Sequence, residues 1–184
     1  MDGPTNLFNG NFVQTTRPPH NGGPSGSVIP LNSNYQTIIP TGQLPYYNPD
    51  FWYVGRLISL RHVFQCTSAA TPGAIFANLI AGPNLSANGT GIASAGVNWT
   101  ANVANATSVV EMWVRCVALG QSGLLLAYGT MFIGGTGLLP IPWNTPGVVT
   151  MDLTQGYYIA PQYSRNGSTA ETIQHHDIIY RTMN

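Results

Sequence analysis

The stretch that decides the fold lies in the middle of the chain and reads VVEMWVRCVAL (residues 109–119), GQSG (120–123) and LLLAYGTMFI (124–133). Two apolar runs rich in β-branched and aromatic residues, joined by a short turn that contains glycine, predict an antiparallel hairpin. Outward from this hairpin, similar runs recur between turns of Gly, Pro and Asn. The further strands that we predict cover residues 54–66, 74–80, 92–99, 148–153, 157–163 and 172–181.

No segment of the chain has the 3.6-residue period of an amphipathic helix. Seven or eight strands at a spacing of roughly ten residues, separated by turn residues, are typical of sandwiches and barrels. The sequence therefore predicts an all-β fold, an antiparallel β-sandwich or jelly roll. We expect residues 51–184 to form this body.

The first fifty residues differ in composition from the rest. Residues 1–49 hold eight of the 14 prolines and only two charged side chains, Asp2 and Arg17. Proline excludes helix and central strand there, yet apolar residues recur along the segment. We therefore predict that residues 1–50 form an extended arm that grips a capsid or another subunit. The arm residues that we expect to make these contacts are Phe8, Phe12, Arg17, Ile38 and Ile39, and the aromatic residues on which the arm docks are Phe51, Trp52 and Tyr53.

Charge is scarce along the whole chain. Charged residues make up 7% of it, where about 25% is usual for a globular protein. All six basic residues are Arg and none is Lys, the residue type most depleted at protein interfaces. The low charge favours a surface that packs against other proteins. No window is basic enough for nucleic acid, and no apolar run is long enough for a membrane span, so we expect neither partner.

The residues that catalysis or metal binding would need are few. The densest polar cluster is His175-His176-Asp177. In a regular strand, His175 and Asp177 share one face, which is too few ligands for a metal, and we expect solvated or interfacial side chains there. Cys66 and Cys116 each lie in an apolar run, which predicts buried thiols, although a disulfide between them remains open. We predict no enzyme, no catalytic or metal-binding residue and no cofactor.

The last forty residues resemble a known class of virion protein. The segments that carry the resemblance are VVTMDLT (148–154), YYIAPQY (157–163), STAETI (168–173) and IIYR (178–181). This ending is similar to that of small trimeric jelly-roll proteins in the virions of tailed phages and related viruses. There, a strand with Asp-Leu-Thr precedes an aromatic-rich strand, a polar turn and a final strand. The resemblance implies a homotrimeric sandwich that decorates a capsid or caps a spike.

The composition, the arm and the resemblance together predict a capsid cement or decoration protein. Such a protein would bind the major capsid protein or other virion subunits as a homotrimer, stabilise the shell through its arm, and reside in the virion after assembly in the host cytoplasm. One alternative is a receptor-binding or glycan-binding domain of a tail fibre or spike, which an exposed loop of aromatic and Asn residues within Asn84–Asn105 would favour. Another is a small capsid protein that assembles into the shell by itself.

Overall fold

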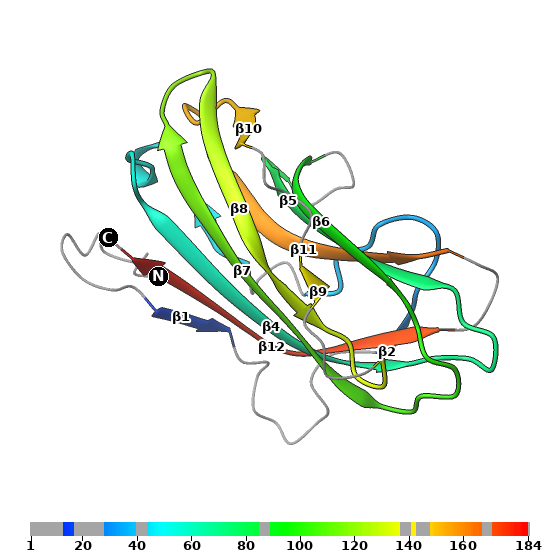
Figure 1. The fold of residues 1–184 in the computed structure, drawn as a ribbon. Coiled ribbons are helices and arrows are strands. Elements are labelled where there is room, and N and C mark those ends of the chain that lie inside the picture. Colours follow the sequence, from blue (N-terminus) through cyan, green and yellow to red (C-terminus); the bar gives the residue numbers. More distant parts are fainter. Residues whose placement is uncertain are drawn as a thin grey trace.

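The computed structural model describes residues 13–16, 28–39, 44–84, 89–136, 141–142, 148–166 and 171–183. This part of the chain consists of strands and turns, with one 3-10 turn, η2 (Pro49–Phe51). The strands form two antiparallel sheets that pack face to face (Figure 1). The predicted fold class, an all-β antiparallel sandwich of the jelly-roll type, is confirmed.

The larger sheet has eight strands. Its main path runs in the order β1 (Val13–Thr16), β12 (Thr172–Met183), β4 (Leu57–Thr67), β7 (Ala106–Ala118), β8 (Gly123–Phe132) and β10 (Val148–Met151). Two short strands lie beside this path: β2 (Val28–Pro30) pairs with β12, and β9 (Ile141–Pro142) pairs with β8. The central hairpin predicted from the sequence is β7 and β8, in which Trp113 faces Tyr128 across the pair.

The smaller sheet has four strands, in the order β3 (Tyr46–Tyr47), β11 (Tyr157–Arg165), β5 (Ala74–Gly82) and β6 (Thr90–Asn98). The weak strand predicted at 92–99 is β6, which pairs with β5 along its length. The other predicted runs also form strands, with ends that differ by a few residues. The run predicted from Val54, for example, begins only at Leu57, because residues 54–55 form a turn in which Gly55 has φ +95°.

The core lies between the two sheets, and the residue pattern of the central strands explains why they form. On β4, every second side chain from Ile58 to Cys66 is buried, and β7 repeats this alternation from Ser108 to Cys116. A period of two places these side chains on one face of the sheet, where they meet the smaller sheet. Burying one Leu, Ile, Val, Met or Phe side chain contributes about 1.5–3 kcal/mol, so this layer supplies most of the driving force for folding.

The described part of the predicted arm packs on the body. We call residues 28–39 and 44–47 the N-terminal segment. It begins as β2 on the edge of β12, continues along β11 with reciprocal backbone hydrogen bonds between Gln36 and Tyr163 (2.8 and 2.9 Å), and ends as β3 on the same edge of β11. The segment thus crosses from the edge of one sheet to the edge of the other. Of the predicted arm, the described residues 13–16, 28–39 and 44–50 thus pair with or pack on the body, so residue 50 is not a boundary in the described part of the chain.

Two of the predicted arm anchors are corrected by this packing. Ile38 and Ile39 are buried among the core side chains of the chain itself, together with Leu31 and Leu44. They fill the open side of the sandwich, and a side chain enclosed in its own core does not reach a capsid. The other three anchors, Phe8, Phe12 and Arg17, lie outside the described residues. In the part of the chain that is described, no helix is long and apolar enough to cross a membrane.

Candidate functional site

The outer face of the larger sheet is apolar where β7, β8 and β10 lie side by side. On β8, the odd-numbered side chains face the core, so the even-numbered ones face outward, and most of these are apolar too. The register brings outward residues of the three strands together, because Trp113 faces Tyr128 and Leu126 faces Val148. We call these four residues, together with Phe132, the outer patch.

Three residues of the outer patch are exposed, Trp113 and Leu126 are half-buried, and the two rings of the patch contact each other. The rings of Trp113 and Tyr128 stack at 5.7 Å between centroids with an interplanar angle of 15°. Tyr128 is 45% exposed and Val148 is 50% exposed. Antiparallel sheets with one solvated face normally alternate between apolar and polar side chains, and the outward side chains are then the polar ones. Contiguous apolar area on an outer face is a feature of surfaces that bind another protein or a ligand.

The charges around the outer patch are few. Arg61 on β4 and Glu111 on β7 lie opposite each other and form a surface ion pair with a nitrogen-to-oxygen distance of 3.3 Å. Arg115 faces Leu126 across the β7–β8 pair and is exposed. A surface ion pair of this kind contributes at most about 1 kcal/mol. The face is therefore almost neutral, with apolar side chains at its centre and arginines at its margin.

The outer face of the smaller sheet is different. On β6 the exposed side chains are small or polar, among them Ser94 and Asn98, and two exposed positions are Gly91 and Gly96. The glycan-contacting loop considered within Asn84–Asn105 consists largely of this strand and of turns at either end, with residues 85–88 outside the described part. Along β6 the smaller sheet thus offers small and polar side chains. At its β3–β11 edge, however, it also carries aromatic residues, because the rings of Tyr46, which is 48% exposed, and Tyr158 lie 4.9 Å apart between centroids at an interplanar angle of 59°.

The aromatic residues predicted as a docking point lie where the N-terminal segment meets the body. Phe51 packs against Tyr47 of β3 at 4.6 Å and against Trp52 at 5.1 Å between ring centroids. Trp52 is buried in the core, whereas Tyr53 is exposed. The guanidinium of Arg56 lies over the rings of Phe51 (4.6 Å) and Tyr53 (4.1 Å), and it donates a hydrogen bond to the carbonyl of Phe51. These residues fix the turn that leads into β4.

A buried polar network crosses the sandwich beneath the N-terminal segment. The hydroxyl of Tyr163 on β11 lies 2.6 Å from Nδ1 of His62 on β4, and Nε2 of His62 lies 3.0 Å from Nδ1 of His175 on β12. All three side chains are buried. When the tyrosine hydroxyl donates to Nδ1 of His62, the proton of His62 sits on Nε2 and is donated to His175. The network therefore connects the two sheets through a directed chain of hydrogen bonds.

Burial keeps this network uncharged. It lowers the pKa of His62 well below its ordinary value, and the neighbouring His175 and His176 lower it further. The pKa of His175 is lowered to about 4, first by burial and then by His176. The pKa of the Tyr163 hydroxyl is raised by burial. At neutral pH the three groups are thus an imidazole pair and a phenol, without a charge.

This position of His175 corrects the prediction for the His175-His176-Asp177 cluster. A β-bulge lies between His175 and Asp177, so the two side chains do not share a face as they would in a regular strand. His175 turns into the core and is 1% exposed, whereas His176 and Asp177 are half-buried. His175 is therefore neither solvated nor at the surface.

A buried ion pair with its hydrogen bonds holds loops at one end of the sandwich. Glu171 is fully buried and pairs with Arg165 at 3.1 Å, and the same Arg165 side chain donates a hydrogen bond to the carbonyl of Leu31. Glu171 also accepts a hydrogen bond from the backbone of Gly73.

Cys66 and Cys116 are free buried thiols, as the apolar runs predicted, so the disulfide that remained open from the sequence is absent. Among the described residues, no three His, Cys, Asp or Glu side chains gather as ligands for a metal ion.

Comparisons with known proteins identify no family for this chain. No protein-family model matches the sequence, and no curated protein matches it. Among solved structures, it is similar to a lectin from Bauhinia forficata in complex with GalNAc. The sequence identity is 11% and the TM-score is 0.43, over 95% of this chain and 93% of the lectin chain. A likeness at this identity concerns the fold alone.

Sequence reasoning missed both the outer patch and His62. Trp113 and Tyr128 stand in the run that defined the hairpin, and the signal for the patch was present there. Residues 124–133 are apolar at both parities, which in an antiparallel sheet predicts an apolar outer face as well as an apolar inner one. For His62 no local signal exists, because its partners lie 101 and 113 residues away along the chain.

Proposed function

We propose that this chain is a structural subunit of a virus particle, a capsid cement or decoration protein that acts as a homotrimer. The observation that carries the proposal is the outer patch. A sandwich that worked alone would present polar side chains on the outer face of its larger sheet, whereas this one presents a stacked Trp113–Tyr128 pair flanked by apolar residues. Such a face favours a protein partner, and aromatic residues are enriched at the centre of protein interfaces.

The partner that suits this face first is another copy of the chain. Copies of one protein repel each other when they carry a large net charge, but here the formal net charge is zero and charged residues are scarce. The arginines at the margin of the patch, such as Arg115, are of the residue type that interfaces favour over lysine.

The virion role draws on the sequence as well. The C-terminal segments are similar to those of small trimeric jelly-roll virion proteins, and the lysine-free, charge-poor composition suits a subunit whose surface is covered by neighbours. Three copies of the residues that flank β1, with Phe8, Phe12 and Arg17, would bind the major capsid protein, and this multivalent attachment would strengthen modest contacts. The protein would act in the virion after assembly in the host cytoplasm, without catalysis and without contact to nucleic acid or membrane.

The first experiment measures the absolute mass of the purified chain by light scattering after size exclusion. We expect a trimer of about 59 kDa, which is three times the 19.7 kDa of one chain. Tyr128→Arg, at an exposed position in the outer patch, should convert the trimer into a folded monomer. Ser94→Arg is the matched control, because it adds the same charge to an exposed position on the smaller sheet. A wild-type monomer, or a trimer that Tyr128→Arg leaves intact, would contradict the assignment of the patch.

The second experiment tests the capsid role separately. The trimer should co-sediment with purified shells of the virus that encodes the chain, and deletion of residues 1–12, which precede β1, should abolish this binding without changing the mass of the trimer. Shells that bring down none of the intact trimer would refute the decoration role. A selective hit on a glycan array would instead support the receptor-binding alternative, and particles of about 60 subunits or more would support a self-assembling capsid protein.

A further inference from the structure

We infer that the outer patch of one copy binds the smaller sheet of the next copy, at a second surface formed by Tyr46 and Tyr158. We call these two residues the tyrosine rim. The inference rests on the proposed function, because it names the surface that the outer patch contacts within the homotrimer. It predicts a head-to-tail contact, in which each copy uses two different surfaces.

The symmetry of a trimer requires two surfaces for each contact. A ring of three identical copies has no two-fold axis, so each pairwise contact joins one surface of a copy to a different surface of its neighbour. The outer patch therefore needs a complementary surface on the neighbouring copy. That surface must be exposed, must accept aromatic and apolar side chains, and must carry charges that suit the margin of the patch.

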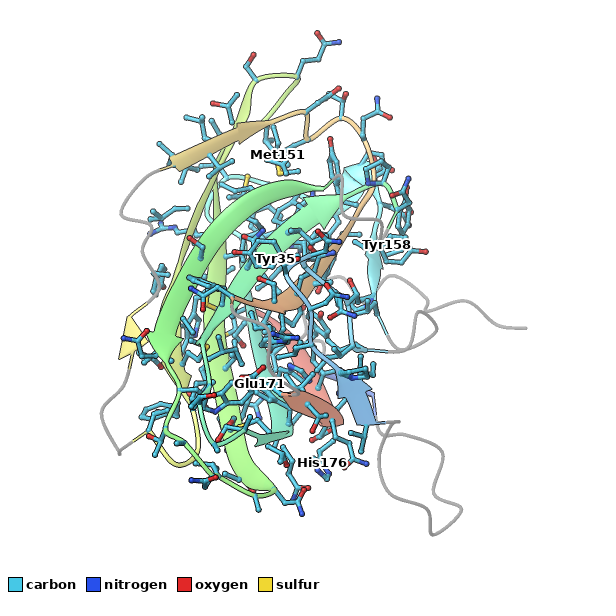
Figure 2. The ribbon with its side chains drawn as sticks, turned by 90° about the vertical axis from the view of Figure 1, so that its right-hand side faces the viewer. Tyr35, Met151, Tyr158, Glu171 and His176 are labelled. Atoms are coloured by element: carbon cyan, nitrogen blue, oxygen red, sulfur yellow. The ribbon has the colours of Figure 1, made fainter. Side chains whose placement is uncertain are left out.

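The tyrosine rim lies on the outer face of the smaller sheet. Tyr46 of β3 pairs with Tyr158 of β11, and the side chains that precede or follow them in the strands, Tyr47 and Tyr157, are buried in the core. Figure 2 shows Tyr158 beside β3 at the margin of the molecule. The hydroxyl of Tyr46 lies against Gly156, where a Cβ would collide with it. The rim thus offers two large rings that rest on each other and on the backbone.

One copy cannot bring its own two surfaces together. The outer patch is on the outer face of the larger sheet, the tyrosine rim is on the outer face of the smaller sheet, and the core lies between them. Two copies can join these surfaces when the patch of one lies on the rim of the other. Aromatic residues on both sides suit such a contact, because Trp and Tyr are enriched at the centre of protein interfaces.

The margin of the outer patch carries a positive charge. Arg115 of β7 faces Leu126 of the patch and is exposed, and it forms no ion pair with a carboxylate of the described residues. Glu111, on the same strand, is already paired with Arg61. The margin of the patch therefore suits a partner surface that carries carboxylates.

The tyrosine rim is accompanied by two such carboxylates. Asp50 is exposed in η2, which follows β3 directly in the chain. The pKa of the Tyr157 hydroxyl is raised by burial and then by the charges of Asp152 and Tyr46, so both of these groups lie near it. Hydrogen bonds from the side chain and the backbone of Thr154 lower the pKa of Asp152, which keeps its carboxylate ionised at neutral pH.

The opposite charges of the two margins favour one pairing of surfaces over the others. Among the described residues, neither Asp50 nor Asp152 forms an ion pair with an arginine. Contact of patch with rim brings Arg115 toward these carboxylates, whereas contact of patch with patch, or of rim with rim, brings like charges together. Complementary charge at the margin and aromatic side chains at the centre therefore both select the head-to-tail contact.

Mixing two monomeric variants tests the contact directly. Tyr128→Arg breaks the patch and Tyr46→Arg breaks the rim, so we expect each variant alone to be a folded monomer. In an equimolar mixture, the intact rim of the first variant meets the intact patch of the second. We expect a heterodimer of about 39 kDa, twice the 19.7 kDa of one chain, which cannot grow because its two outer surfaces are broken.

Light scattering measures this mass over a range of concentrations, because a heterodimer has one contact where each copy in a ring has two. Ser94→Arg is the matched control for Tyr46→Arg, since it adds the same charge to an exposed position elsewhere on the smaller sheet, and it should remain a trimer. Circular dichroism of each variant alone checks that the sheets are intact.

Exchanging two charges gives a second test that leaves the tyrosines in place. Arg115→Glu and Asp50→Arg should each weaken the contact by about 2- to 10-fold, since each replaces an attraction by a repulsion of the size of an exposed ion pair. The double variant restores opposite charges on the two margins, and its association should return toward that of the wild type. Dilution series at low ionic strength, where screening is weakest, measure the dissociation constants.

The outcomes separate this inference from the proposed function. A wild-type monomer would contradict the homotrimer, and the head-to-tail contact would fail with it. A wild-type trimer that Tyr46→Arg leaves intact, or a mixture of the two variants that stays monomeric at every concentration, would overturn the contact while the trimer stands. When Tyr46→Arg fails to fold, the charge exchange decides, and a double variant weaker than both single variants would refute the contact.

Discussion

Truncating Ile39 to alanine tests whether the N-terminal segment belongs to the folded core. The Ile39 side chain is 3% exposed and packs in the same cluster as residues of both sheets. Ile39→Ala removes three carbon groups, and at about 0.8 kcal/mol for each the lost burial amounts to about 2.4 kcal/mol. The cavity that remains adds to this loss, since substitutions of this kind cost about 2–5 kcal/mol in total. We expect the free energy of unfolding to fall by about 3 kcal/mol.

The assay is equilibrium unfolding in urea, followed by the fluorescence of the buried Trp52 and Trp99. For a slope of about 2–3 kcal/mol per molar urea, the loss shifts the midpoint of unfolding by about 1 M or more. Val28→Ala is the control on the same segment, because Val28 is 57% exposed, and it should change stability by less than about 0.5 kcal/mol. An Ile39→Ala protein as stable as the wild type would refute the packing and restore the free arm predicted from the sequence.

Three further predictions concern the polar groups of the core. The free energy of unfolding should be constant above pH 6.5 and fall by about 2–3 kcal/mol as the pH drops toward 4. The reason is that His175 has a pKa of about 4 in the folded chain and of about 6.5 in the unfolded chain. Urea midpoints at pH 7, 5.5 and 4.5 check this, and a flat profile would contradict it. Tyr180→Phe should lower the free energy of unfolding by about 1–2 kcal/mol in the same assay, because the hydroxyl donates a buried hydrogen bond of 2.8 Å to the carbonyl of Ile159. An unchanged free energy of unfolding would mean that water replaces this bond. Glu171→Ala should cost about 3–5 kcal/mol by leaving Arg165 largely buried without its carboxylate, which a melting temperature near that of the wild type would disprove.

The strands of the body were predictable because their residues carry local signals. The run from Ile58 to Cys66 alternates between buried and less buried side chains, and the 109–133 hairpin contains its own turn. The order of strands in the sheets was not predictable in the same way. β12 lies between β4 and the N-terminal strands, and nothing in the sequence of either partner states this pairing. Pairing is decided by the fit of whole faces and by loop lengths, which a single sequence does not reveal.

The N-terminal segment shows where composition misleads. Proline and glycine predict the absence of helix and central strand in this segment, and the described strands β2 and β3, which lie at sheet edges, agree with that rule. Yet an apolar side chain in an irregular segment can either contact a partner protein or be buried in the core of its own chain. Ile38 and Ile39 are buried in the chain's own core. Only the position of the open side of the sandwich decides between the two, and that position is a property of the assembled sheets.

The bulge in β12 explains the error at His175. A strict period of two assigns His175 and Asp177 to one face, and one extra residue is enough to separate them. The sequence contains no glycine or proline at this point to announce the irregularity. By contrast, the outer patch could have been recognised from the apolar residues at both parities of 124–133. A face that is apolar where solvent is expected is visible in a sequence, whereas a buried pair more than a hundred residues apart is not.

The place of β12 in the larger sheet has a consequence for synthesis of the chain. Strand β4, made early, has its partners in β7 and in β12, and β1 and β2 rest on β12 alone. On the ribosome, β4 and the two N-terminal strands therefore wait with unpaired edges until residues 172–183 have emerged from the exit tunnel. Sheets that depend on such distant pairings fold slowly, and until they have folded they expose unpaired strand edges that are prone to aggregate. We expect truncated translation products to aggregate, and the yield of soluble protein to depend on chaperones that cover those edges during synthesis.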